Sequence, residues 1–114
     1  MIIVAANIIF ASEADRDRAV ELSKPIQQAT RDEEPGCQAY CFAPDPCDPV
    51  AIQVYELWDD GTTLAAHFEH PNYLAMLEIF NEVGITGSTN RAYLSTRDES
   101  VYGPENEIKT TFFV

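Results

Sequence analysis

Residues 50–73, VAIQVYELWDDGTTLAAHFEHPNY, carry the clearest structural pattern in the chain. The first part, Val50 to Trp58, is rich in β-branched and aromatic residues that alternate between two faces, which predicts a strand. The Asp-Asp-Gly that follows is typical of a turn. Thr62 or Thr63 can then cap a short helix. Pro71 suits the first turn of another helix, because its missing N–H would be unpaired there anyway.

Two histidines, His67 and His70, follow Trp58 after this short turn and helix. An aromatic side chain at the end of a strand, close to imidazole groups on the next helix, indicates a cavity with His67 and Trp58 beside it. The two histidines could also hold a metal ion if Glu69 or Glu78 supplied a third ligand. A single short spacing of this kind is a weak signal, and we expect no metal site.

The composition limits the class of protein. The 114 residues are 46% hydrophobic, which suits one folded domain over residues 1–114 with one core. The net charge of −12 argues against binding to nucleic acid or to an anionic membrane surface. No segment approaches the roughly 20 apolar residues of a membrane-spanning helix. The apolar N-terminus lacks the basic start of a signal peptide, so we expect a cytoplasmic protein.

Three cysteines, Cys37, Cys41 and Cys47, are an odd number. That count fits reduced thiols better than a disulfide framework. We expect them to be small, buried or partly buried residues without a chemical role.

The first strand, Ile2 to Phe10, is apolar on both faces, so both faces should be covered. A chain this short can cover one face with its own helices, and a second subunit would cover the other. Asn7 is the only polar side chain in this strand. It either makes a structural hydrogen bond or points into a cavity, because an unpaired buried amide costs about 1–3 kcal/mol.

The remaining elements complete a ferredoxin-like α+β pattern, strand-helix-strand-strand-helix-strand. Ser12 and Asp15 can cap the first long helix, in which Pro25 predicts a kink or a break. A further strand at the C-terminus would be an exposed edge unless it paired with a partner subunit. The expected elements are a helix over Ser12–Glu33, a strand over Cys37–Ala43, a helix over Asn72–Val83 and strands over Thr89–Thr96 and Ile108–Val114.

Three motifs occur in order: RDEEPGCQAY at Arg31–Tyr40, YELW at Tyr55–Trp58 and AHFEHPNY at Ala66–Tyr73. Together they resemble the antibiotic biosynthesis monooxygenase family of the dimeric α/β-barrel superfamily. The resemblance extends over about Ile2 to Leu94. It implies a homodimer in which the sheets of two subunits pack face to face into a barrel.

The resemblance also implies a reaction. Similar family members oxidise quinols or polycyclic phenols with O₂ and need neither a metal nor a bound flavin. His67 would then remove the phenolic proton, since imidazole changes its charge near neutral pH. Trp58 and Asn7 would hold the substrate or the oxygen. The cavity would be lined by Tyr40, Tyr73, Phe68 and Phe80.

Several alternatives stay open from sequence. Trp58 and His67 could serve only to fill and fasten the core. The chain could be a non-catalytic dimeric barrel that binds a small apolar ligand, or an isomerase on the same scaffold. A haem-degrading branch of the superfamily uses an Asn, a Trp and a His on the second main helix. Asn7 and Trp58 match, but Leu77 stands about where that histidine is expected, which disfavours haem degradation.

Overall fold

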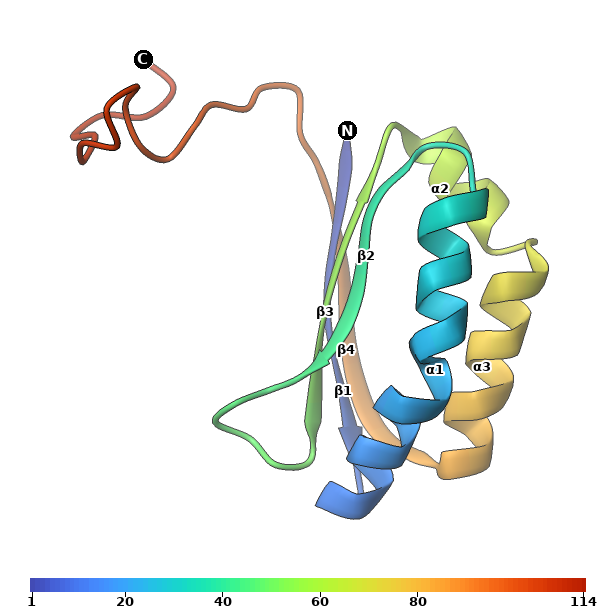
Figure 1. Cartoon of the computed structure of the whole chain (residues 1–114). Coiled ribbons are helices and arrows are strands. Elements are labelled where there is room, and N and C mark those ends of the chain that lie inside the picture. The colour runs from blue at the N-terminus through green and yellow to red at the C-terminus, as the bar shows by residue number, and fades with distance from the viewer.

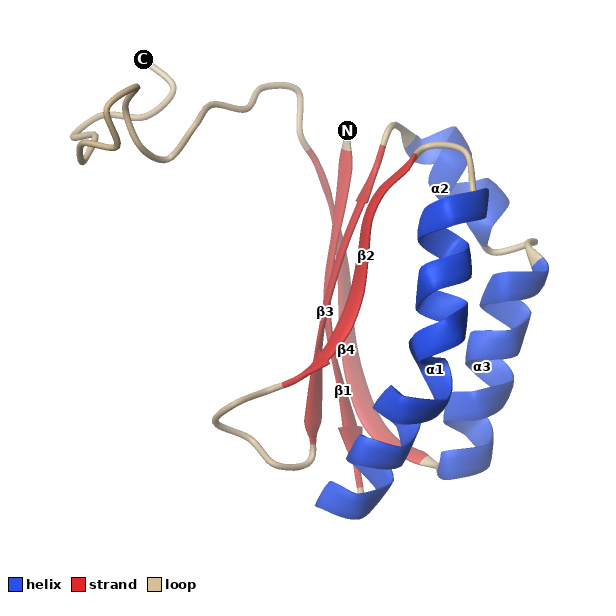
Figure 2. Ribbon diagram, in the orientation of Figure 1, coloured by secondary structure: helices blue, strands red, loops and turns tan.

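The computed structural model describes residues 1–114 and has an α+β fold with a four-stranded antiparallel sheet. The strand order β2-β3-β1-β4 is that of the ferredoxin-like arrangement, so the predicted fold class is confirmed. α1 and α3 lie side by side on one face of the sheet (Figures 1 and 2). In chain order the elements are β1 (Ile2–Phe10), α1 (Glu13–Glu33), β2 (Cys37–Pro44), β3 (Ala51–Trp58), α2 (Gly61–His67), α3 (Pro71–Val83) and β4 (Ile85–Leu94).

The helix starts are fixed by local hydrogen bonds. Ser12 caps α1 as predicted, its hydroxyl accepting from the N–H of Asp15 at 3.1 Å. Asp60, rather than Thr62 or Thr63, caps α2, and its carboxylate accepts from the N–H of Thr63 at 2.8 Å. The earlier residue is favoured because a carboxylate is a stronger acceptor for the free N–H groups than a hydroxyl.

The two proline predictions differ in outcome. Pro25 lies inside α1, which continues as one helix from Glu13 to Glu33, so the predicted break is wrong and the alternative, a kink, stays a prediction. Pro71 occupies the first turn of α3, as predicted. The residue before it, His70, caps α3, because its Nδ1 accepts from the N–H of Asn72 at 3.0 Å.

The core lies between one face of the sheet and the two long helices. Strand alternation turns Ile52 and Val54 toward the helices and leaves Gln53 and Tyr55 on the other face. Trp58 is fully buried at the end of β3. The core cluster comprises Ile8, Phe10, Ala19, Tyr40, Ile52, Val54, Trp58, Met76 and Phe80.

The second face of the sheet is not covered by any helix of this chain (Figure 2). Tyr55 on β3 and Tyr93 on β4 are each about half exposed there, at 48% and 52%. Every residue of β4 is exposed, because no helix packs closely against this edge strand, whereas α1 packs against β2 at the other edge. The sequence prediction that a partner subunit covers this face remains a prediction.

The predicted C-terminal strand over Ile108–Val114 is wrong for the single chain. After Leu94 the chain leaves the sheet as an extended arm, residues 95–114 (Figure 1). Ser95, its first residue, still exchanges hydrogen bonds with Met1 at 2.8 Å. Beyond Ser95 the arm has an isolated bridge between Tyr102 and Ile108. A strand needs a neighbour to accept its hydrogen bonds, and residues 108–114 pair with no strand of their own sheet.

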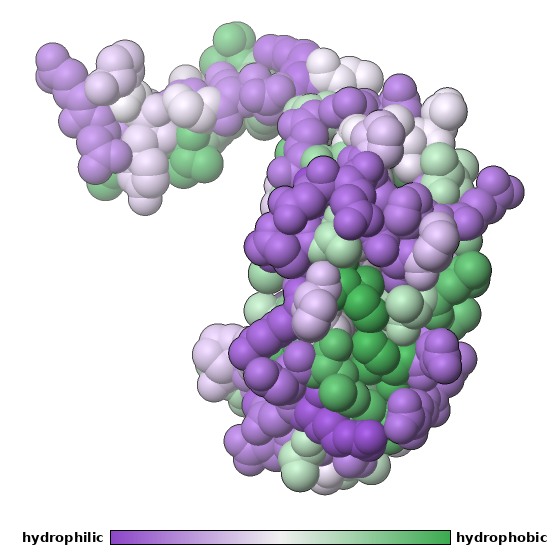
Figure 3. Space-filling model, turned by 45° about the vertical axis from the view of Figure 1, so that its right-hand side comes forward, coloured by the Kyte–Doolittle hydropathy of each residue, from purple (hydrophilic) through white to green (hydrophobic).

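The outer surface of the helical layer is partly hydrophobic. Viewed from this side, hydrophobic residues gather in a patch bordered by hydrophilic ones (Figure 3). Leu22 on α1 and Leu74 and Leu77 on α3 are 41–55% exposed. None of the helices combines the length and apolar character needed to cross a lipid bilayer.

Candidate functional site

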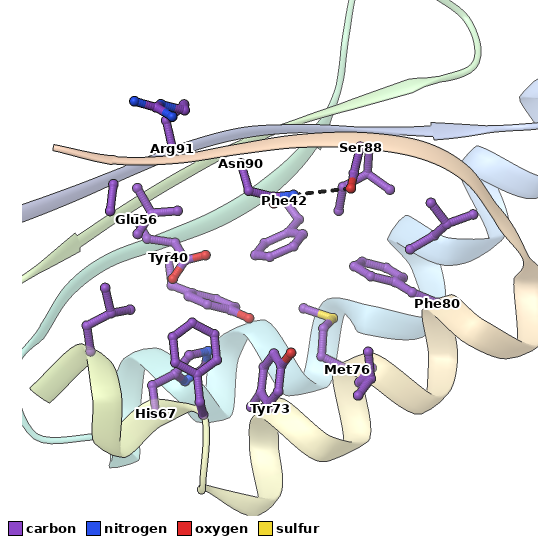
Figure 4. Close-up of a pocket in the computed structure, with 17 residues that line it drawn as sticks. Tyr40, Phe42, Glu56, His67, Tyr73, Met76, Phe80, Ser88, Asn90 and Arg91 are labelled. Atoms are coloured by element: carbon purple, nitrogen blue, oxygen red, sulfur yellow. Dashed lines mark hydrogen bonds between the residues drawn. The ribbon is translucent and has the colours of Figure 1, made fainter.

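A cavity of about 520 Å³ lies between the inner face of the sheet and the helices α2 and α3 (Figure 4). Twelve of its 17 lining residues are hydrophobic, and its volume falls within the range of small-molecule sites. The other five lining residues are Glu56, His67, Ser88, Asn90 and Arg91, and two of the twelve, Tyr40 and Tyr73, also carry a hydroxyl group.

The cavity exists because β4 carries short side chains. Neither long helix packs closely against β4, whereas α1 packs against β2 and α3. Ser88, Asn90 and Ala92 lie on the inner side of β4 and fill little of the space opposite α3. The amide of Asn90 donates to the hydroxyl of Ser88 at 3.1 Å, which fixes a polar wall on this side (Figure 4).

His67, the last residue of α2, is held by a buried carboxylate. Its Nδ1 lies 2.7 Å from Oε1 of Glu34, and the two side chains are 2% and 3% exposed. The other oxygen of Glu34 accepts from the amide of Asn72 at 3.2 Å. A carboxylate only accepts, so Nδ1 carries the proton of the neutral imidazole.

The second ring nitrogen of His67 opens into the cavity. Nε2 makes no hydrogen bond within the chain. Because every fully buried side-chain N or O atom does have a hydrogen-bond partner, Nε2 is not fully buried. His67 lines the cavity, so Nε2 is accessible from it. With its proton on Nδ1, the imidazole presents a lone pair to whatever the cavity holds.

The turn after α1 brings Glu34 to His67. Gly36 has a φ of +83°, a conformation that favours glycine. A Cβ at this position would lie 2.5 Å from the side chain of Thr63, so α2 begins directly against the turn. The N–H of Asp59 donates to the carbonyl of Gly36 at 2.9 Å. These contacts fasten the end of α1 to the start of α2.

Aromatic rings enclose the imidazole of His67. The ring centroids of Trp58, Tyr40, Tyr73 and Phe68 lie 4.8, 5.4, 5.5 and 5.6 Å from that of His67. Such packing holds the imidazole in one orientation and keeps water from much of its surface. A proton transfer at Nε2 would therefore take place in surroundings of low polarity.

Glu56 is a second buried carboxyl group at this site, and it lines the cavity. Its Oε1 accepts from the indole N–H of Trp58 at 2.9 Å. Burial raises the pKa of Glu56 above its ordinary value, and the nearby Glu34 carboxylate acts in the same direction. The hydrogen bond from Trp58 and the proximity of His67 oppose that rise in pKa.

Two tyrosine hydroxyl groups point into the cavity, those of Tyr40 and Tyr73 (Figure 4). Burial, with Glu56 and Glu34 close by, raises the pKa of Tyr40 far above its ordinary value. Tyr40 therefore stays protonated and is a hydrogen-bond donor at any ordinary pH.

Most of the residues predicted from sequence come together here. His67, Tyr40, Tyr73, Phe68 and Phe80 all line the cavity. Trp58 lies behind them, packed on His67 and bonded to Glu56.

Asn7 does not join this group, because it lies on the face of the sheet turned away from the helices. Its Oδ1 accepts from the hydroxyl of Thr89 at 2.8 Å, which is the structural alternative considered from sequence. No grouping of three or more His, Cys, Asp or Glu side chains in the chain could hold a metal ion.

The comparison with protein families now decides the assignment. The model of the antibiotic biosynthesis monooxygenase family matches residues 1–79. The chain belongs to this family. No curated protein matches the sequence. The matched residues include Glu34, Glu56, Trp58 and His67, whereas β4 and the C-terminal arm lie beyond the match.

Several solved structures share the fold of this chain. A candidate antibiotic biosynthesis monooxygenase from Deinococcus radiodurans superposes with a TM-score of 0.79 at 23% identity, over 90% of this chain and 100% of that one. A candidate monooxygenase from Nitrosomonas europaea gives 0.68 at 18% identity, over 85% and 100%. One from Caulobacter crescentus gives 0.73 at 14% identity, over 84% and 91%. At these identities the likeness shows the fold and not the reaction.

Proposed function

We propose that this chain is a monooxygenase that oxidises a quinol or polycyclic phenol with O₂ and requires no metal or flavin. The observation that carries the proposal is the Nε2 atom of His67, which faces an aromatic cavity of about 520 Å³ while Nδ1 is bonded to Glu34. This arrangement provides a base of fixed tautomer, a largely apolar binding space and hydroxyl donors. The family assignment supports the same class of reaction.

In the proposed reaction, Nε2 of His67 takes the proton of a substrate hydroxyl. The resulting phenolate is electron-rich and passes one electron to O₂, which becomes superoxide. The substrate radical and superoxide then combine to form a C–O bond and, after protonation, a hydroperoxide. Loss of the adjacent C–H proton with cleavage of the O–O bond gives a carbonyl and water. One oxygen atom enters the product and one enters water, and the substrate supplies all the electrons.

The protein contributes position and polarity to these steps. Glu34 stabilises the imidazolium that forms on His67, since a buried carboxylate lies against Nδ1. Tyr40 and Tyr73 supply hydroxyl donors toward the anion. The surrounding rings limit the access of water to the imidazole of His67, whose side chain is 2% exposed, and this strengthens its interaction with Glu34.

We also propose that the active form is a homodimer in the cytoplasm. The uncovered sheet face, with Tyr55 and Tyr93 half exposed, supports the dimer, and so does the arm with Phe112 and Phe113 at 47% and 48% exposure. Three free cysteines fit a reducing compartment. Light scattering on the purified chain should give twice the monomer mass, and a monomeric mass would contradict the dimer.

The experiment is oxygen uptake by metal-stripped protein with a panel of reduced quinols and polycyclic phenols. The informative variant is His67→Gln, because glutamine can still donate to Glu34 but cannot take a proton. His70→Asn is the matched control, since asparagine preserves the helix cap at that position. We expect uptake above the spontaneous rate in the wild type and in His70→Asn, with loss in His67→Gln.

Two other outcomes would redirect the assignment. Uptake that is equal in His67→Gln and the wild type would contradict the role of His67. Ligand-induced stabilisation without uptake of oxygen on any compound would favour a non-catalytic binding barrel. Conversion of substrate without oxygen would indicate an isomerase.

A further inference from the structure

Glu56 is a buried carboxyl group that the proposed oxygenation does not use. It is 7% exposed, and its Oε1 accepts from Trp58. No hydrogen bond engages Oε2, yet every fully buried side-chain N or O atom has a partner. Oε2 is therefore not sealed, and the open space beside Glu56 is the cavity that it lines (Figure 4). A carboxyl oxygen that opens into the cavity is solvated by water there until a ligand replaces that water, so a ligand that offers no hydrogen-bond donor leaves the oxygen unpaired.

Trp58 places this oxygen and the base at the same end of the cavity. Its indole ring packs on the imidazole of His67, with 4.8 Å between the centroids, and its N–H holds the carboxyl group of Glu56. Met76, Leu77, Phe80 and Ile85 line other parts of the cavity and offer no polar side-chain atom to an oxygen substituent. A fitting ligand therefore carries a polar group near Trp58 and hydrocarbon against these four side chains, while Ser88 and Asn90 on β4 form a second polar surface.

The charges around the cavity also limit the ligand. Two carboxyl groups, Glu56 and Glu34, lie close to His67. Arg91 is the only arginine or lysine among the lining residues, and its side chain points away from the cavity (Figure 4). A ligand that arrives as a carboxylate would meet like charge without a cation to offset it.

We propose that Glu56 is a substrate-binding residue whose Oε2 accepts a hydrogen bond from a hydroxyl group of an uncharged hydroxyaromatic substrate. This inference rests on the proposed function, because it places the hydroxyl next to the base, and it names the substrate class for the same site. Glu56 thereby selects against aromatic ethers and aromatic carboxylates of equal size.

Three ring-matched probes test the proposal: naphthol, its methyl ether and naphthoic acid. Binding is followed in the full-length protein by the indole N–H signal in proton–nitrogen NMR spectra. The chain has one tryptophan, so this signal belongs to Trp58, which donates to Glu56. The comparison is made among the wild type, Glu56→Gln, which keeps an acceptor for Trp58, and Glu69→Gln, an exposed control.

In the wild type and in Glu69→Gln, naphthol should bind about tenfold or more tightly than its methyl ether, with naphthoate weakest. In Glu56→Gln the preference for naphthol over the ether should largely disappear, because an amide N–H replaces the accepting oxygen. An unchanged preference in Glu56→Gln would overturn the proposal. Tighter binding of naphthoate than of naphthol, or no binding of any probe, would also overturn it.

The wild type alone gives a second measurement if Glu56→Gln does not fold. A hydroxyl bonded to Oε2 draws charge from Oε1, so naphthol should shift the Trp58 indole signal further than the ether does at saturation. Equal shifts would contradict the proposal. None of these measurements requires oxygen. Selective binding through Glu56 without oxygen uptake would therefore support the role of Glu56 and contradict the oxygenase. Oxygen uptake without selective binding through Glu56 would support the oxygenase and contradict the role of Glu56.

Discussion

The Nδ1 atom of His67 lies 2.7 Å from Oε1 of Glu34, and both side chains are almost completely buried. A pair this deep in the protein is costly to desolvate and is stabilising only if its remaining hydrogen bonds are made. The amide of Asn72 donates to the second carboxylate oxygen of Glu34, while Nε2 of His67 faces the cavity. The pair therefore fixes the tautomer of the proposed base at the same time as it joins α1 to α2.

We predict that Glu34→Gln slows turnover by about 10- to 1000-fold, because the imidazolium loses its anionic partner. Glu34 is a positioning residue, so the test needs a readout of His67 itself. Nitrogen NMR of the imidazole rings is suitable because the chain has only two histidines. The wild type should show the proton on Nδ1, and the variant a mixture of tautomers. Unchanged tautomer and turnover would contradict this role, and Glu33→Gln provides an exposed neighbouring control.

A second prediction concerns the pH dependence of stability. Burial raises the pKa of Glu56 above its ordinary value of 4.5, so the folded protein binds this proton more tightly than the unfolded chain. The contribution of Glu56 to stability therefore falls as pH rises from 4.5 through the raised pKa. Glutamine does not ionise, so its contribution to stability does not change with pH. Relative to the wild type, Glu56→Gln should therefore gain free energy of unfolding as the pH rises above 4.5.

Denaturant unfolding of both proteins at each pH measures this difference. The other titratable groups around Glu56 are Glu34 at the end of α1, His67 on α2, and Cys37 and Tyr40 on β2, and all are present in both proteins. Glu56 raises the pKa of Cys37 and Tyr40, and both thiol and phenol lose their protons only at higher pH. A difference between variant and wild type that does not change with pH would show that Glu56 ionises normally in the folded state.

A third prediction concerns the turn that carries Glu34. Gly36→Ala should destabilise the protein by about 1–3 kcal/mol, since the residue has positive φ and a Cβ would collide with Thr63. Gly61→Ala is the control, because a Cβ at that position would meet no atom within 4 Å and alanine favours a helix. Thermal unfolding should separate the two variants. Equal melting temperatures would mean that the turn adapts without cost.

The fourth prediction concerns thiol reactivity. Burial, with Glu34 and Glu56 nearby, raises the pKa of Cys37 to about 11, so little reactive thiolate forms near neutral pH. Cys47 is exposed, so an alkylating reagent can reach its thiol directly. Alkylation of the native protein, mapped by mass spectrometry, should modify Cys47 well before Cys37. Comparable rates in the native state would contradict the prediction, and both should react alike after unfolding.

Much of this architecture was predictable because local patterns agreed with tertiary packing. β1 has the expected bounds. Pro71 begins α3 as predicted, because its missing N–H leaves no unpaired donor in the first turn of a helix. The strand over Ile108–Val114 was predicted from its apolar residues, but strand formation depends on a neighbour that the single chain does not supply. Cys47 was expected to be at least partly buried and is exposed, because it lies in the loop between β2 and β3.

The site was predicted less completely than the fold. His67 and the aromatic lining were expected, whereas Asn7 lies on the opposite face because alternation along β1 turns it away from Ile8. Glu34 was missed, since sequence shows a helix-ending acid but not the distant imidazole that it meets. Glu56 left a readable signal, a carboxylate on the same strand face as Ile52 and Val54. A charge on a buried face indicates either a compensated pair or a functional group.

The most direct test of the central claim is turnover under isotopically heavy oxygen gas with metal-stripped protein and its best quinol or phenol substrate. We expect one heavy oxygen atom in the product and one in water, no inhibition by a chelator, and loss of the labelled product in His67→Gln but not in His70→Asn. A product that contains no heavy oxygen, or equal labelling in His67→Gln and the wild type, would contradict a monooxygenase that works through His67.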